Sequence, residues 1–228
     1  ATFDEPNHLV RGYMPLVTGD FRFNTGHPPL INMLSAVPLL FIKNIDTSTE
    51  NYGWKNIDIW QFSHYFLYLS RNNADKLIFY GRLPVLFLSL LLAFLIFKWA
   101  DEIYGKKAAF FALFLYVFNP IIIASATQIT TDLGVTFFIF LSLYLFWKFV
   151  KEPTKKRLIF LLIAFGLAQV SKFSAVFLYP VFLLLCLAIL IKHKKFLMPF
   201  GFIGKIKNLK LKNAASILLF FTLLFAVS

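Results

Sequence analysis

Charged residues and cysteine are scarce in this sequence. Only 15% of the 228 residues are Asp, Glu, Lys or Arg, against about a quarter in an average soluble domain. The single cysteine, Cys186, cannot form an internal disulfide, and no Asn-x-Ser/Thr glycosylation acceptor occurs. These shortages exclude a disulfide scaffold and a cysteine-ligated metal site, and the low charge argues against a soluble domain.

Hydrophobic residues instead make up 59% of the chain, and many of them stand in long runs. Residues 77–97 contain one charge, Arg82; residues 108–127 contain none; residues 133–150 contain only Lys148. Each run is long enough to cross about 30 Å of hydrocarbon as a helix. The sequence therefore predicts an all-α, polytopic membrane protein.

The apolar stretch 158–191 lies between two basic loops. As one helix, its 34 residues would be about 51 Å long, which is too long for a single crossing. We expect it to turn back near residues 168–172, as two short crossings or a re-entrant pair. Residues 214–228 resemble a spanning helix cut short, and no initiator Met or signal peptide precedes Ala1, so we interpret the chain as a fragment truncated at both ends.

The chain is expected to have two parts. Residues 1–76 form a polar first loop, in which 28–42 and 60–70 are apolar or aromatic stretches suited to the membrane interface. Residues 77–228 form a transmembrane helix bundle. The expected helices of this bundle are 77–97, 108–127, 133–150, 158–170, 173–191 and 214–228.

The net charge of +12 comes from Lys and Arg in short loops, a pattern of membrane topology rather than of nucleic-acid binding. Together with Lys148, the loops 98–107, 151–157 and 192–213 hold 15 of the 23 basic residues and should be cytoplasmic. Each crossing moves the chain to the other side of the membrane. Counting crossings from these loops therefore places the first loop, Asp132 and Lys172 on the opposite, non-cytoplasmic face.

The first residues of the chain carry the best candidates for chemistry. If a helix follows Asp4, then Asp4, His8 and Arg11 share one helical face at i, i+4 and i+7. Asp4 is then either a helix cap or a general base, which needs a carboxylate within reach of a substrate hydroxyl. His27 precedes two prolines and is either incidental to a rigid turn or held there to contact an anion or a metal.

Three later charges lie at predicted outer helix ends. Arg82 either extends to the membrane surface or binds an anion through its guanidinium fork. Asp132 either caps the helix that starts at residue 133 or belongs to the site. Lys172 is either a loop charge or a second cation of the site.

These motifs together resemble the protein O-mannosyltransferase family, whose relatives include the lipid A aminoarabinose transferases. The resemblance covers about residues 1–191. It rests on Phe3-Asp4-Glu5 with His8, Gly19-Asp20, His27-Pro28-Pro29-Leu30, Gly81-Arg82-Leu83-Pro84, Thr130-Thr131-Asp132, Gly166-Leu167-Ala168 and Ser171-Lys172-Phe173-Ser174-Ala175. Where the aminoarabinose transferases have Glu-Lys before the two prolines, this chain has Gly26-His27. That difference argues against a metal site of their kind.

The resemblance implies a GT-C-like transmembrane helix bundle with an outer-face catalytic loop. It implies a polyprenyl-phosphate-linked sugar as donor and a hydroxyl acceptor on protein, lipid or glycan. The sugar would be transferred with inversion of its configuration. Asp4 would be the general base, and Glu5 and Asp132 would orient the acceptor or the neighbours of Asp4. The expected substrate- and phosphate-binding residues are Arg82, Lys172, His27, His8 and Arg11.

No obligatory metal is expected, although a weakly held divalent ion at Asp4, Glu5 and His27 is an alternative. The expected partners are membrane lipids and the two substrates, without nucleic acid. The expected location is a bacterial inner membrane, with the site on the periplasmic or extracellular face. Two other hypotheses remain open, a transporter or flippase of lipid-linked sugars and a non-catalytic membrane subunit.

Overall fold

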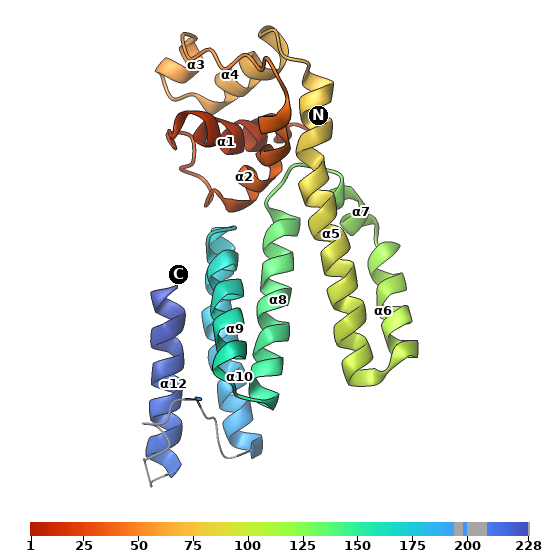
Figure 1. Ribbon diagram of the computed structural model, residues 1–228, viewed down its shortest axis with the longest axis vertical. Helices are drawn as coiled ribbons and strands as arrows, with labels where there is room; N and C mark the ends of the chain where they lie inside the picture. The colour runs from red at the N-terminus through yellow and green to blue at the C-terminus, as the bar shows by residue number, and fades with distance from the viewer. Residues whose placement is uncertain (194–197, 200–208, 228) are drawn as a thin grey trace. The chain divides into compact units, whose positions relative to one another are not determined.

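A computed structural model describes residues 1–193, 198–199 and 209–227 of the protein (Figure 1), and these residues form helices and connecting loops. The chain divides into two compact units, Ala1–Phe137 and Phe138–Ser228. The first unit contains α1 (Glu5–Thr18), α2 (Leu30–Ala36), η1 (Val37–Phe41), α3 (Tyr52–Lys55), α4 (Ile59–His64), the π-helix η2 (Tyr65–Leu69), α5 (Ala74–Tyr104), α6 (Lys106–Val117), α7 (Pro120–Ala126) and the start of α8 (Asp132–Lys151). The second contains the rest of α8, α9 (Lys155–Gln169), η3 (Phe173–Phe177), α10 (Leu178–His193) and α12 (Leu209–Ala226).

Three of these helical segments are long and apolar enough to cross a membrane: α5, α8 and the continuous stretch Phe173–Lys192. The pair α6 and α7 makes a fourth candidate if it counts as one span. These segments lie where the sequence predicts crossings, and the prediction of an all-α polytopic membrane protein is confirmed. With 31 residues, α5 is about 47 Å long and exceeds the hydrocarbon thickness of about 30 Å.

The apolar run 108–127 is broken rather than continuous. The helix α6 stops at Val117, and α7 starts at Pro120 with a bend of 65° between them. The side chain of Asn119 accepts a hydrogen bond from the backbone N–H of Ile121 at 2.9 Å. An Asn cap followed by Pro at the first helical position is a favourable helix start, which explains why the chain begins a new helix here.

The stretch 158–191 also breaks where the sequence predicts. The helix α9 ends at Gln169 and η3 begins at Phe173. The Gln169 amide donates to the backbone oxygen of Ala175 at 3.0 Å, and the Ser171 hydroxyl donates to that of Leu167 at 2.6 Å. The Ser171 hydroxyl thus satisfies a backbone oxygen at the end of α9, and Gln169 connects that end to η3. Most of the basic loop 192–213 lies outside the described residues, so its cytoplasmic position stays a prediction.

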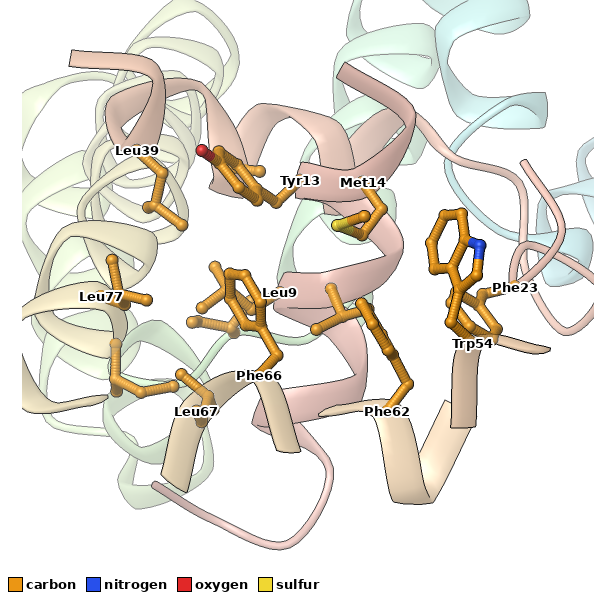
Figure 2. Packing of buried hydrophobic residues seen from close by; sticks show 14 residues of the cluster. Leu9, Tyr13, Met14, Phe23, Leu39, Trp54, Phe62, Phe66, Leu67 and Leu77 are labelled. Carbon is orange, nitrogen blue, oxygen red and sulfur yellow. The ribbon is translucent and has the colours of Figure 1, made fainter. Parts of the chain in front are cut away.

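The first unit is built around α1, whose apolar face is covered by aromatic side chains (Figure 2). Phe62 and Phe66, from α4 and η2, are 0% and 1% exposed and belong to one cluster with Leu9 and Met14 of this face. In Figure 1, α1 to α4 gather beside the N-terminal half of α5, while α6 runs beside its C-terminal half. The two polar-loop stretches 28–42 and 60–70 therefore contribute helices to a packed core.

The second unit has an aromatic core of its own. The Phe146 and Phe182 rings stack with centroids 4.8 Å apart, and Phe165 and Phe220 pack against Phe182 at 5.8 and 6.1 Å. Phe165, Phe182 and Phe220 are completely buried. Offset aromatic pairs at these distances add to the burial of their surface, so α8, α9, α10 and α12 are held together by phenylalanine.

The contact between α1 and α2 requires a glycine. A Cβ atom built on Gly12 would lie 1.8 Å from the backbone oxygen of Asn32 in α2. Any larger residue therefore has to push the two helices apart. The helices carry His8 and Arg11 on one side of this contact and Asn32 on the other, so their spacing also fixes the candidate site.

We predict that Gly12→Ala lowers the melting temperature by several degrees. In an open helix position the same change stabilises by about 1 kcal/mol, and here the clash reverses the sign because the neighbouring atom is backbone. Thermal unfolding in detergent, followed by tryptophan fluorescence, measures the effect. Val17→Ala, on the exposed side of α1, is the control and should melt like wild type. A stabilised Gly12→Ala protein would contradict the close contact.

Candidate functional site

A completely buried carboxylate, that of Glu5, holds three segments of the first unit together. Arg82 of α5 donates to it through Nε and a terminal nitrogen, both at 2.7 Å. The backbone N–H of Thr2 donates to Oε2 at 2.7 Å, and that of Ile129 donates to Oε1 at 3.0 Å. We call these four residues the Glu5 clasp. It connects the start of α1, α5 and the loop between α7 and α8.

The clasp keeps Glu5 ionised. Burial alone raises the pKa of this carboxyl, but the hydrogen bonds from Arg82, Thr2 and Ile129 outweigh burial and lower the pKa from 4.5 to about 2. Since the pKa is lower in the folded state, the stabilisation is complete above about pH 4.5 and is lost as the pH falls towards 2. Glu5 is therefore a charged anchor at neutral pH.

The packing around the clasp is tight. A Cβ atom on Gly81, the residue before Arg82, would lie 2.7 Å from Cδ1 of Ile129 and 2.8 Å from Cδ1 of Leu9. Glycine thus allows α1 and the loop after α7 to approach α5 directly beside the ion pair. Close packing excludes water from the carboxylate, which strengthens its hydrogen bonds.

Asp4, the predicted general base, precedes Glu5 of the clasp, but its side chain is not buried as that of Glu5 is. It occupies the N-cap position of α1, yet its side chain makes no capping hydrogen bond. The residue is exposed. Its carboxylate is therefore accessible, while the neighbouring Glu5 fixes the backbone that carries it.

The predicted alignment of Asp4, His8 and Arg11 is confirmed, because α1 begins directly after Asp4 and the three side chains interact electrostatically. The structure adds His27, whose ring stacks on His8 with centroids 6.2 Å apart. Burial lowers the pKa of His8, and Arg11 and His27 lower it further, against the opposing effects of Asn32 and Asp4. Asp4, His8, Arg11 and His27 therefore lie close together in the first unit.

Arg82 was expected to bind phosphate. In the structure two of its guanidinium nitrogens are occupied by Glu5, and its side chain is 36% exposed. The other terminal nitrogen has no hydrogen bond to the residues that the structure describes. Glu5, expected to orient the acceptor, likewise accepts four N–H donors and has little capacity left. The sequence did not predict this pairing.

The other two predicted charges belong to different units. Asp132 is exposed at the first residue of α8 in the first unit, three residues after Ile129 of the clasp. Gly134, in the same turn, faces Ile31 of α2 so closely that a Cβ would lie 2.4 Å from Cδ1. Lys172 lies in the second unit, between α9 and η3, and its place in the site stays a prediction.

Among the described residues, no group of three or more His, Cys, Asp or Glu side chains is arranged to hold a metal ion. The alternative of a weakly bound ion at Asp4, Glu5 and His27 would use a carboxylate that Arg82 already occupies. Of those three residues, Glu5 is thus the least suited to a metal. A metal-independent reaction remains our expectation from the sequence.

The sequence interpretation missed Asn32 and Gly26. Asn32 is 1% exposed in α2, and its Oδ1 accepts a hydrogen bond from Nδ1 of His8 at 3.0 Å. Gly26 faces Arg11, and a Cβ at this position would lie 3.6 Å from both terminal guanidinium nitrogens. The available signal was that Asn32 is one of only two polar residues in the apolar segment 30–36.

The fold and the polar residues define the class of protein. It is a polytopic membrane protein, and its first loop carries accessible acidic and basic side chains beside a buried ion pair. The family model of the dolichyl-phosphate-mannose-protein mannosyltransferases matches residues 62–209. The chain belongs to this family. Its members are glycosyltransferases that use a sugar carried on a lipid phosphate, and the resemblance expected from the sequence is confirmed.

The matched range contains Arg82, Asp132 and Lys172, whereas the motifs around Asp4 and His27 precede it. Searches among curated proteins and among solved structures found no match to the chain. The roles of the residues before position 62 are therefore argued from this structure.

We predict that Glu5→Gln destabilises the protein by about 1.5–3 kcal/mol at pH 7. The buried amide cannot neutralise Arg82 and loses the charge-assisted hydrogen bonds, while solvent partly compensates the guanidinium, which is 36% exposed. The drop in melting temperature can be measured by tryptophan fluorescence in detergent.

The matched control is Glu50→Gln. Glu50 also forms an ion pair, with Lys55 at 2.8 Å, but both side chains are more than half exposed. Exposed pairs contribute little, so this variant should melt like wild type. Equal melting temperatures for the two glutamine variants would show that the clasp is not an anchor.

Proposed function

We propose that the protein transfers a sugar from a polyprenyl-phosphate donor to an acceptor hydroxyl, with inversion at the anomeric carbon and Asp4 as the general base. Family membership supports the donor class. The observation that carries the role of Asp4 is its exposed carboxylate, which occupies a cap position without capping the helix. A base has to reach the hydroxyl proton of its substrate, and an exposed carboxylate on an anchored backbone meets this need.

The proposed step moves one proton and one sugar. The acceptor oxygen attacks the anomeric carbon as its proton passes to a carboxylate oxygen of Asp4. The bond between the anomeric carbon and the phosphate oxygen breaks, and the lipid phosphate leaves with the bonding electrons. Attack and departure on opposite faces of the carbon invert its configuration.

A phosphate is already a fair leaving group, so the protein mainly needs to position the reactants and stabilise charge. In our proposal Asp132 orients the acceptor. Asp132 follows Ile129 by three residues, and the backbone N–H of Ile129 donates to Glu5, the neighbour of Asp4. His27 contacts the phosphate, and the place of Lys172, which belongs to the second unit, stays a prediction from the sequence. Arg82 acts chiefly through Glu5, since that is where two of its nitrogens donate.

The site is proposed to lie at the non-cytoplasmic face, with a protein, lipid or glycan as the acceptor. The support for this face is the charge distribution, since the loops 98–107 and 151–157 at the other helix ends are basic. Neither the sugar nor the acceptor follows from the residues, so the first experiment has to survey donors.

We predict that Asp4→Asn lowers sugar transfer by about a hundredfold or more, because the amide cannot accept the proton. The protein is reconstituted in proteoliposomes with a panel of radiolabelled polyprenyl-phosphate sugars, and release or transfer of the label is measured. The donor that wild type turns over identifies the sugar.

Asp58→Asn is the control. Asp58 is also an N-cap aspartate, half-buried, and its carboxylate does cap α4 by accepting from the N–H groups of Trp60 and Gln61. Asn caps equally well, so this variant should keep full activity. Equal activity of Asp4→Asn and wild type would reject Asp4 as the base. Passage of labelled lipid across the bilayer without any transfer would support a transporter instead.

A further inference from the structure

The second unit carries a concentrated positive charge where α8 turns into α9. Residues 148–157, which we call the α8–α9 hairpin, contain four lysines and Arg157 but only one acidic residue, Glu152. The basic loop 98–107, by contrast, has three lysines against two acidic residues. The hairpin belongs to a different unit from Asp4 and the Glu5 clasp, and the proposed reaction gives it no role.

The hairpin neutralises its own acidic residue. Arg157 pairs with the Glu152 carboxylate through one terminal nitrogen. Through the other terminal nitrogen it donates to the backbone oxygen of Lys148 at 2.8 Å. That oxygen lies in the last turn of α8, where a cation is favourable for the helix. Arg157 thus serves the hairpin itself, and the sequence of the hairpin offers no second acidic residue to its four lysines.

Two of the lysines lie over aromatic rings of α8. The Lys151 ammonium group is 3.7 Å from the centroid of the Trp147 ring. The Lys148 ammonium group lies 5.5 Å from the same ring and 5.6 Å from that of Tyr144. The two rings stack with centroids 6.0 Å apart. A ring attracts a cation through its quadrupole but has no net charge, so it orients an ammonium group without cancelling the charge.

The two rings also indicate where this end of α8 lies in a membrane. The helix is long and apolar enough to span the bilayer, and Tyr144 and Trp147 lie near its C-terminal end. Tryptophan and tyrosine are enriched at the level of the lipid headgroups. The ammonium groups that contact these rings therefore lie at the level of the lipid phosphates.

The first turn of α9 adds charge that does not favour the helix itself. Lys155, Lys156 and Arg157 occupy this turn, although the N-terminal end of a helix favours anions. Arg157 holds the start of α9 against the end of α8. Lys151 and Lys156, one on each side of the turn, are exposed. An anion bound here relieves the unfavourable charge and can reach both ammonium groups.

The partner that fits the hairpin is a phospholipid with a net negative headgroup. Its phosphate supplies acceptor oxygens, and its net charge balances lysines in a way that a zwitterionic headgroup does not. Basic residues next to membrane-spanning helices are attracted to such lipids. A nucleic acid or an acidic protein would approach from water and would gain nothing from aromatic rings at the headgroup level.

We propose that the α8–α9 hairpin binds the headgroup of an anionic phospholipid, with Lys151 as the main contact and Trp147 packing beside it. Lys156 adds positive charge from the start of α9, and Lys148 shares the Trp147 ring. The lipid is a bound neighbour of the second unit and takes no part in sugar transfer. The inference therefore does not rest on the proposed function.

The test measures lipid binding to the purified protein by native mass spectrometry. Phosphatidylglycerol and phosphatidylcholine with identical acyl chains are titrated separately, and the Kd of the first bound lipid is obtained for each. Wild type should bind phosphatidylglycerol more tightly. Lys151→Gln should weaken phosphatidylglycerol about fivefold, the contribution of one basic residue near a negatively charged membrane surface. The Kd of phosphatidylcholine should stay the same.

A variant without the ring tests the geometry apart from the charge. Trp147→Leu keeps an apolar side chain and all four lysines of the hairpin. It should weaken phosphatidylglycerol about two- to fivefold, because Lys151 loses the cation–π contact that orients it. Lys151→Arg keeps both the charge and the ability to stack on the ring, so it should bind like wild type.

A pair of double variants separates a site from general attraction to positive charge. Lys151→Gln combined with Lys156→Gln should weaken phosphatidylglycerol about 25-fold, as expected if the two single losses multiply. Lys106→Gln combined with Lys107→Gln is the matched control, because it also removes two exposed lysines, from the loop 98–107. The control should bind like wild type. Melting temperatures recorded for each variant identify any that fail to fold.

Several outcomes would overturn the proposal. Unchanged phosphatidylglycerol affinity of folded Lys151→Gln would do so, as would equal affinities of wild type for the two lipids. Equal losses in the two double variants would show attraction to total charge and would reject the hairpin as a site. Full affinity of folded Trp147→Leu would reject the aromatic contact. Polyprenyl phosphate that binds more tightly than phosphatidylglycerol, and depends on the same lysines, would reject a phospholipid as the occupant.

Discussion

The first unit depends on the need to neutralise one buried carboxylate. Glu5 is completely buried, and a charge in that position is tolerated only when paired and hydrogen-bonded. Arg82 supplies the opposite charge, and backbone N–H groups of Thr2 and Ile129 complete the set. Because these donors come from three separate segments, the carboxylate fixes where each segment lies. Gly81 favours the same approach, since a Cβ there would press on the side-chain ends of Ile129 and Leu9.

The adjacent acidic residues Asp4 and Glu5 differ in exposure because they are one helical step apart. Asp4 and Glu5 are neighbours in sequence, but successive helical residues point about 100° apart. Glu5 therefore faces the core and α5, whereas Asp4 is exposed at the helix start. The buried member anchors the backbone, and the exposed member keeps a carboxylate available for chemistry. Arg82 and Arg11 differ in a similar way, because Arg82 has a carboxylate partner, whereas Nε of Arg11 is buried without a hydrogen-bond partner among the described residues.

The sequence predicted the parts that depend on local pattern. Apolar length indicated α5, α8 and the stretch Phe173–Lys192, and the flanking basic loops indicated the break after Gln169. The pairing of Glu5 with Arg82 could not be read in this way, because it joins residues 77 apart through tertiary packing. The same holds for Asn32, whose importance lies in its burial beside His8 and not in any motif.

The length of α5 indicates where Arg82 of the clasp lies relative to the membrane. The helix is about 17 Å longer than the hydrocarbon layer, so part of it has to extend beyond that layer. Arg82 is its ninth residue, roughly 12 Å from the helix start, and therefore falls near the membrane boundary. Pairing with Glu5 cancels its charge at a depth where an isolated arginine would be costly. A transporter would instead require such charges at mid-membrane depth, and α5 carries no charge between Arg82 and Lys98. The depth of Arg82 in α5 thus favours a site at the membrane surface, where a lipid-linked phosphate would be presented.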